Sequence, residues 1–194
     1  MLIPAVARRL RRPVRWIESR REHFLATAPD RDQHHRARLG VAQDGTVTAV
    51  QTIFTRDGGA YPVLGDVIAL NSINHLPGPY RIANVKGLAT NVVTHKTFTP
   101  AYRGAGRPEI ACVLDRLLDR AARPLGMDPL DFPSMRNELG IKGVGESGIV
   151  SPVPAIANAV EDALADRGVE IARVPLTAAS VWQALRNARR PSAP

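Results

Sequence analysis

The sequence contains one cysteine, Cys112, in 194 residues. A single thiol excludes an internal disulfide framework and any zinc or iron–sulfur site built from several cysteines. A reducing, cytoplasmic setting fits this composition. No segment reaches the roughly 18 consecutive apolar residues that a membrane-spanning helix needs. The short apolar start of the chain precedes its arginines, which is the reverse of the order in a secretory signal peptide.

Aromatic residues are also scarce, at 5% of the chain, so we expect a core of valine, isoleucine, leucine and alanine. With 44% hydrophobic residues, the chain is large enough for one or two compact domains. Acidic residues are outnumbered, and the net charge is +8. Ten arginines lie within residues 1–40. No DNA-binding motif or interleaved aromatics accompany them, so a solvated helix face or a subunit contact is favoured over a nucleic-acid-binding module.

Apolar periodicity predicts several secondary-structure elements. Residues 2–10 have apolar positions at helical spacing, and residues 14–17 are interpreted as a short strand. Residues 35–57 alternate around Asp44-Gly45, which predicts a β-hairpin. Gly58, Gly59, Pro62 and Gly65 indicate a loop.

Beyond that loop, the pattern changes from extended to helical. Residues 80–95 look extended, whereas residues 108–122 carry one apolar stripe at helical spacing. A further helix is expected to end near Gly168, and Thr177 is expected to cap a last helix that buries Val181 and Leu185. The predicted fold is therefore α/β (α+β), a mixed sheet with covering helices.

Two glycine-rich segments could carry chemistry, each directly before a predicted helix. The first, residues 101–109 (AYRGAGRPE), combines glycines with Arg103, and it is a candidate loop for an anion or an oxo ligand. The second, residues 140–148 (GIKGVGESG), places Glu146 among glycines, where a carboxylate could act as a general base. From spacing alone, a structural turn remains the stronger interpretation of residues 101–109. For residues 140–148, a loop with an exposed glutamate remains the stronger interpretation.

The histidines and the cysteine predict no metal site. His34 and His35 are neighbours at the start of a strand, so their side chains point to opposite faces and cannot chelate one ion together. Cys112 lies off the apolar stripe of its helix, without a visible cationic partner, and a structural role is expected.

Taken together, several segments resemble the large subunits of the xanthine dehydrogenase, aldehyde oxidase and aerobic carbon monoxide dehydrogenase family. They follow the order of that family and cover nearly the whole chain. The segments are residues 12–22, 57–61, 78–85, 101–109, 142–148, 155–160 and 176–182.

The resemblance implies a molybdopterin-type molybdenum cofactor and an oxidoreductase that hydroxylates its substrate with a water-derived oxygen. Glu146 would be the catalytic base, and Arg103 would stabilise negative charge on the substrate. Gly104, Ala105, Gly106 and Gly145 would line the cofactor pocket. These glycine-loop positions hold no cysteine, which favours aldehydes or N-heterocycles over carbon monoxide as substrates. An iron–sulfur subunit and a FAD subunit would accept the electrons.

The chain also departs from the family pattern. Intact members are several times longer, and a glycine-rich cofactor motif is expected before the first helix. Between about Asp131 and Asn137 the sequence passes from one family segment to a much later one. We therefore expect residues 1–133 to be part of a first cofactor-binding domain and residues 138–194 to be the C-terminal end of a second. Such a truncated and internally deleted chain should be inactive alone, and a non-enzymatic remnant or subunit-interaction fragment is the alternative.

Overall fold

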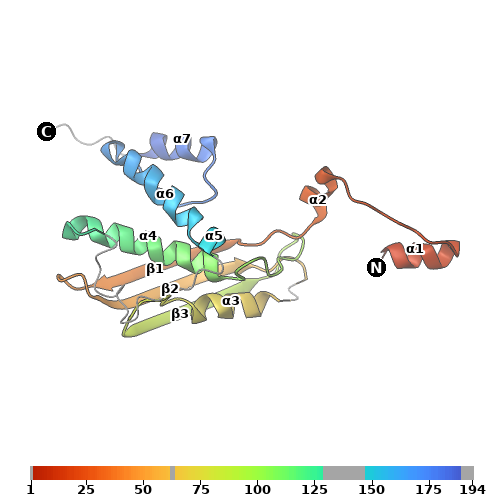
Figure 1. Cartoon of the computed structure of the whole chain (residues 1–194), viewed down its shortest axis with the longest axis horizontal. Helices are drawn as coiled ribbons and strands as arrows, with labels where there is room; N and C mark the ends of the chain where they lie inside the picture. Colours follow the sequence, from red (N-terminus) through yellow and green to blue (C-terminus); the bar gives the residue numbers. More distant parts are fainter. Residues whose placement is uncertain (1, 62–63, 129–146, 189–194) are drawn as a thin grey trace.

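The computed structural model describes residues 2–61, 64–128 and 147–188. In this part of the chain, a three-stranded mixed sheet carries two helices on one face, and a second group of helices follows it (Figure 1). The expected architecture, a mixed sheet with covering helices, is confirmed.

The predicted hairpin forms the first two strands, β1 (Gln33–Val41) and β2 (Val47–Asp57), which pair antiparallel. Its turn is closed by the Asp44 carboxylate, which accepts a hydrogen bond from the Thr46 N–H at 2.9 Å, while Gly45 adopts a φ of 83°. The third strand, β3 (Asn84–Val92), pairs parallel to β2. Because parallel neighbours need a crossover connection, a helix lies between these two strands in the chain.

Two helices, α3 (Gly65–Asn74) and α4 (Arg107–Leu125), cover the same face of the sheet. Val50 of β2 belongs to the core that α4 closes, and Gly87 of β3 lies so close to Ile73 of α3 that a Cβ there would be 2.7 Å from an Ile73 methyl group. Gly87 pairs with Thr52, two residues beyond Val50, so both contacts lie on one side.

The main core forms between α4 and the sheet. The apolar stripe predicted for residues 108–122 is confirmed, since Ile110, Leu114 and Leu118 are 2–3% exposed. They pack against Val47, Val50, Leu76 and Ala122. α4 ends at Gly126, whose left-handed φ of 63° suits a glycine C-cap.

The C-terminal helices form a smaller unit on α4. They are α5 (Ser147–Val150), α6 (Pro152–Ala163), the short η3 (Ala165–Arg167) and α7 (Ala178–Asn187). Their core consists of Ala157, Val169 and Ile171. The end near Gly168 and the Thr177 cap are confirmed, because Gly168 has a φ of 64° and the Thr177 hydroxyl accepts a hydrogen bond from the Ser180 N–H.

Two sequence-based expectations are wrong. Residues 14–17 form no strand, and Ile17 is 78% exposed, because no neighbouring strand satisfies their backbone groups. Leu185 is 39% exposed and Val181 is only half-buried, since α7 packs on the C-terminal core through Ala184.

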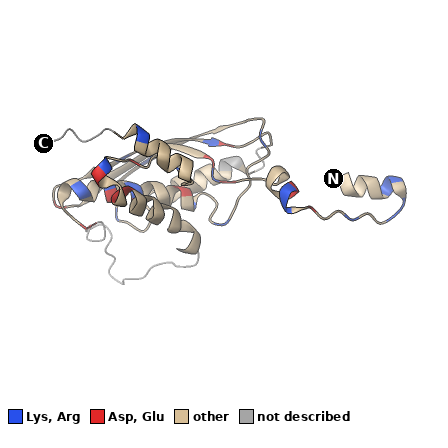
Figure 2. Ribbon diagram, turned by 90° about the horizontal axis from the view of Figure 1, so that it is seen from above, with Lys and Arg blue, Asp and Glu red and all other residues tan. Residues whose placement is uncertain are grey.

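The N-terminal segment carries α1 (Leu2–Leu10) and α2 (Arg20–Ala26), and it extends away from the sheet (Figure 1). Figure 2 shows several Lys and Arg positions, coloured blue, along the ribbon of this segment. The helix predicted for residues 2–10 is confirmed. Within the described ranges, no helix combines the length and apolar character that crossing a membrane requires.

Candidate functional site

The loop that leads from β3 into α4 contains four of the residues singled out in the sequence. Gly104, Ala105 and Gly106 have φ angles of 94°, 46° and 99°. Glycine adopts such left-handed conformations freely, whereas alanine at 105 does so at an energetic cost that surrounding contacts must offset. Three successive left-handed residues therefore give the backbone before α4 a defined shape.

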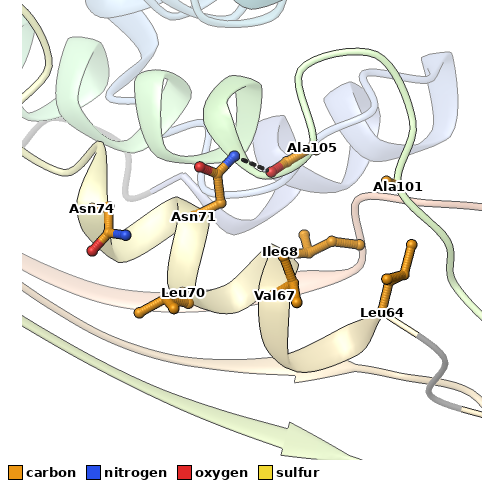
Figure 3. A pocket seen from close by; sticks show the side chains of 8 residues that line it. All are labelled: Leu64, Val67, Ile68, Leu70, Asn71, Asn74, Ala101 and Ala105. Carbon is orange, nitrogen blue, oxygen red and sulfur yellow. Dashed lines mark hydrogen bonds between the residues drawn. The ribbon is translucent and has the colours of Figure 1, made fainter.

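Side chains of α3 hold this part of the loop. The Asn71 amide donates a hydrogen bond to the Ala105 carbonyl oxygen at 2.7 Å (Figure 3), and the Ser72 hydroxyl donates to the Gly106 carbonyl oxygen at 3.1 Å. A Cβ at Gly106 would lie 2.5 Å from the Ser72 oxygen. Glycine is thus required at 106 by the close approach of α3.

Arg103 lies at the exposed side of the same loop. Its guanidinium has no hydrogen-bond or ion-pair partner among the residues that the structure describes, and its carbonyl oxygen accepts a hydrogen bond from Arg31 at 2.6 Å. The N–H groups of Gly104 and Gly106 likewise form no hydrogen bond with any described residue, although both glycines are buried. Considering only the described residues, the loop therefore combines one cation without a partner and two backbone donors without an acceptor, a set that suits a negatively charged group.

Four charged side chains lie behind the loop: the buried Asp30, Arg56 and Glu109, and the partly exposed Arg31. Arg56 is 1% exposed, donates to the Thr99 carbonyl oxygen at 2.7 Å and lies 3.6 Å from the Asp30 carboxylate. Arg31 pairs with the Glu109 carboxylate at 3.2 Å. These four residues, which we call the loop clamp, join the start of β1, the end of β2 and the first turn of α4.

The clamp is not fully satisfied by its own hydrogen bonds. One oxygen each of Asp30 and Glu109 and one nitrogen of Arg56 are buried without a hydrogen-bond partner. Burial raises the pKa of the Glu109 carboxyl, against the lowering effects of Arg31 and Arg56. The clamp therefore keeps three polar atoms without hydrogen bonds next to the loop.

A cavity of about 320 Å³ opens beside the loop (Figure 3). Its wall is mostly apolar, with the amides of Asn71 and Asn74 as the polar groups, and it contains no charged side chain. The lining residues are Leu64, Val67, Ile68, Leu70, Asn71, Asn74, Ala101 and Ala105. Ala105 is therefore shared by the cavity and the loop, whereas Arg103 does not line the cavity.

The other predicted site segment lies outside the described residues, and this includes Glu146 and Gly145. Ser147, the next residue in the chain, begins α5, and α5 contacts α4. Figure 1 shows α5 beside the end of α4 that begins at Arg107. The helix that follows Glu146 therefore contacts the helix that follows Arg103.

The surroundings of His34, His35 and Cys112 indicate a structural role or simple exposure to solvent, and no metal binding or nucleophilic chemistry. His35 stacks on Phe54 with ring centroids 4.5 Å apart, and burial lowers its pKa to about 4. His34, on the opposite face of β1, is exposed. Burial raises the pKa of the Cys112 thiol, which disfavours a reactive thiolate. No group of three or more potential metal ligands occurs within the described parts of the chain.

Comparison with known proteins identifies the family of this fold and loop. A family described as the molybdopterin cofactor-binding domain matches residues 1–137, and the chain belongs to it. The resemblance to large subunits of the xanthine dehydrogenase, aldehyde oxidase and carbon monoxide dehydrogenase type is confirmed.

Individual relatives are considerably longer than this chain. It is 30% identical to the nicotinate dehydrogenase large molybdopterin subunit of Eubacterium barkeri over 63% of its own length, and 33% identical to the aldehyde oxidoreductase of Megalodesulfovibrio gigas over 49%. These matches span 29% and 10% of the relatives. The structure of quinoline 2-oxidoreductase from Pseudomonas putida 86 aligns over 84% of this chain and 22% of that chain, at 29% identity and a TM-score of 0.60.

Sequence reasoning did not find the loop clamp or the two α3 residues that hold the loop. Arg31 and Arg103 are 72 positions apart, and no local pattern connects them. The only available signal was an alternation of charge at residues 30–32, which is equally typical of a solvated turn.

Proposed function

We propose that this chain is part of a molybdenum hydroxylase large subunit, an oxidoreductase that uses a water-derived oxygen to hydroxylate an aldehyde or an N-heterocycle. The observation that carries this proposal is the loop before α4. There the Arg103 guanidinium, which has no partner among the described residues, accompanies the left-handed backbone of residues 104–106. Membership of the molybdopterin cofactor-binding family supports it.

The residues present fit one side of an anionic cofactor. The N–H groups of Gly104 and Gly106, which have no acceptor among the described residues, would hold it, and Ala105 and Gly145 would line the cofactor pocket. When bound, a molybdenum cofactor supplies the oxygen-transfer and two-electron redox chemistry of the hydroxylation. Arg103 would stabilise negative charge that develops on the substrate, and Glu146 would take a proton as the general base. The apolar cavity beside Ala105 does not fit a charged group.

The proposal also divides the chain into parts of two cofactor-binding domains, which differ in length. Residues 1–133 would form part of a first cofactor-binding domain, and residues 138–194 would form the end of a second. The separate small core of the C-terminal helices, formed by Ala157, Val169 and Ile171, supports this division. The chain spans less than a third of these relatives, so the proposal includes an incomplete cofactor site and no turnover by the isolated chain.

Electron transfer requires partners that this chain does not supply. Its single cysteine cannot build an iron–sulfur cluster. We therefore propose an iron–sulfur subunit and a FAD subunit as electron acceptors. This arrangement is supported by relatives that are subunits of complexes, among them a 6-hydroxypseudooxynicotine dehydrogenase of Paenarthrobacter nicotinovorans.

Cofactor binding by the purified chain tests the proposal. The released molybdopterin cofactor is titrated into the full chain, and retained molybdenum is measured after gel filtration. We expect substoichiometric retention, and binding about tenfold weaker in Arg103→Ala, because the loop that would hold the anionic cofactor loses its positive charge as well as its group for the substrate. Arg36→Ala, which removes an exposed arginine from β1, is the matched control and should bind like the unmodified chain.

Three results would contradict this proposal in different ways. Equal retention by Arg103→Ala would refute the site assignment. Complete absence of binding would refute a cofactor role for the chain. One molybdenum per chain together with turnover of an aldehyde or a heterocycle would show that the site is complete.

A further inference from the structure

We infer that Arg31 and Asp30 are positioning residues that fix the backbone on both sides of Arg103. They contact the two neighbouring backbone groups of the loop across more than 70 positions of sequence. The functional importance of these contacts rests on the role proposed for Arg103, whereas the contacts themselves do not depend on that role.

One of the two residues accepts a hydrogen bond from a backbone N–H group of this short segment, and the other donates one to a backbone carbonyl oxygen. The Asp30 carboxylate accepts a hydrogen bond from the Tyr102 N–H at 3.1 Å, and the Arg31 guanidinium donates to the Arg103 carbonyl oxygen at 2.6 Å. The peptide unit between Tyr102 and Arg103 is flanked by these contacts. The direction of a side chain depends on the conformation of its backbone. These two contacts therefore determine the direction in which the Arg103 side chain leaves the loop.

Arg31 uses the forked geometry of its guanidinium for this purpose. One terminal nitrogen pairs with Glu109, whose side chain is 6% exposed, and the other reaches the Arg103 carbonyl oxygen. The guanidinium carbon also lies 5.1 Å from the centre of the Tyr102 ring. A lysine would have to reach both groups from a single nitrogen, so it cannot reproduce two contacts that Arg31 makes from separate nitrogens.

The backbone of Arg31 is itself in an unusual conformation. Its φ of 73° lies in the left-handed region, which is unfavourable for a residue with a long side chain. Such strain persists where surrounding contacts determine the conformation. Here the Asp30 contact to Arg56 and the Arg31 contact to Glu109 anchor the dipeptide from both ends. The loop is thereby attached to a buried base rather than to flexible surface groups.

Residue-resolved amide hydrogen exchange of the full chain, without cofactor, tests the inference. Three loop amides report on it, because the N–H groups of Tyr102, Ala105 and Arg107 donate hydrogen bonds within the loop or to Asp30. We expect Arg31→Ala to raise exchange of these amides about tenfold or more, since hydrogen bonds of a charged donor are lost. Amides of the buried strand β2 should be unchanged.

Two further variants make the result specific. Arg31→Lys keeps the positive charge but loses the fork, and it should raise loop exchange like Arg31→Ala. Arg36→Ala, at an exposed position of the same chain region, should leave the loop unchanged. If Arg31→Ala fails to fold, Arg31→Lys decides by the same criterion.

Unchanged loop exchange in the Arg31 variants would overturn the inference, as would an equal rise in loop and sheet amides, which would indicate general stability instead. The outcome is separable from the proposed function. A loop that responds in a chain that never retains cofactor would leave the positioning role of Asp30 and Arg31 established and the proposed cofactor role of the chain refuted.

Discussion

His35 and Asp115 are two partly buried titratable residues whose effects on stability oppose each other. Burial, with a smaller contribution from His34, lowers the pKa of His35 from 6.5 to about 4. Burial raises the pKa of Asp115 from 3.8 to about 6, against the effect of its hydrogen bond with Tyr80. In the overlapping range, the unfolded chain binds the histidine proton and the folded chain binds the aspartate proton. The histidine therefore makes stability rise with pH, and the aspartate makes it fall.

We predict that His35→Gln exposes the pH dependence of stability that Asp115 causes, which His35 offsets in the unmodified chain. With His35 removed, the free energy of unfolding should fall by on the order of 2 kcal/mol as the pH rises from about 4 to about 6. Asp115→Asn should do the reverse, so that stability is lost as the pH falls from about 6.5 to about 4. Urea unfolding at several pH values measures both slopes. Parallel profiles for the two variants and the unmodified chain would contradict this prediction.

Three glycines form a graded series for the effect of an added methyl group. Gly148→Ala should stabilise the chain by ~0.5–1 kcal/mol, because nothing lies within 4 Å of its Cβ position and it is helical. Gly126→Ala meets no atoms, but its φ of 63° should cost ~1–2 kcal/mol. Gly106→Ala combines a φ of 99° with a contact of 2.5 Å to Ser72, and should cost ~3 kcal/mol or more. Thermal unfolding measures the order, and any other order would disprove this explanation.

At the scale of elements, one buried carboxylate joins α4 to the C-terminal helices. Glu161 of α6 is 2% exposed and accepts hydrogen bonds from Arg116 of α4 and from the Ile171 N–H. Burial opposes the charge of Glu161, but the Ile171 N–H and Arg116 lower its pKa overall. Arg116 also donates to Asn158 and to the Ile171 carbonyl oxygen. One arginine thus contacts both α6 and the segment that follows η3.

We predict that Glu161→Ala releases the C-terminal helices from α4. Removing one partner of a buried ion pair leaves the arginine uncompensated and costs roughly 3–5 kcal/mol. In a Trp16→Phe background, Trp182 fluorescence reports on α7 and circular dichroism reports on the whole chain. The fluorescence transition should move to lower urea than the dichroism transition.

The matched control for that experiment is Glu170→Ala. Glu170 pairs with Arg120, but its side chain is 76% exposed, so its loss should change stability by less than about 1 kcal/mol. Coincident transitions in Glu161→Ala would show that the two parts unfold as one unit despite the lost pair.

The sequence was most informative for elements whose pattern is local. The alternation around Asp44-Gly45 predicted the hairpin, and the apolar stripe of residues 108–122 predicted α4. α3 was missed because it begins at Gly65, the last residue of the glycine and proline cluster that predicted a loop, and because it carries no clear apolar stripe. The parallel pairing of β2 with β3 was not predictable either, because strand direction is set by the crossover and not by composition.

The candidate site was predictable only in part, for the same reason. Arg103 and the glycines beside it lie in one short motif, and their left-handed conformations agree with the glycine pattern. Asp30 and Arg31 act on this motif through contacts between distant segments, which no window of the sequence contains. Motifs therefore identify groups that face a ligand, while the residues that position them emerge only from the fold.

At the scale of the whole molecule, the N-terminal segment makes polar contacts only with itself, as far as the described part of the chain shows. The hydrogen bonds and ion pairs of residues 2–26 remain within residues 2–27, including the capping box of Ser19 and Glu22. Its large apolar side chains are exposed, with Ile17 at 78% and Phe24 at 77%. Exposed apolar residues gathered on one segment are typical of an interaction surface.

Deletion of residues 1–26 should therefore leave the stability of the remaining chain within about 1 kcal/mol of the original, because the deleted segment supplies no described hydrogen bond to the sheet or to α4. The same deletion should lower the fluorescence of a bound apolar dye and reduce self-association, because it removes Ile17, Phe24 and their exposed neighbours. Urea unfolding and analytical ultracentrifugation measure the two effects. Asp30 and Arg31 are retained, so the loop before α4 should exchange as in the full chain. A loss of stability above roughly 2 kcal/mol would mean that the segment packs against the sheet in solution.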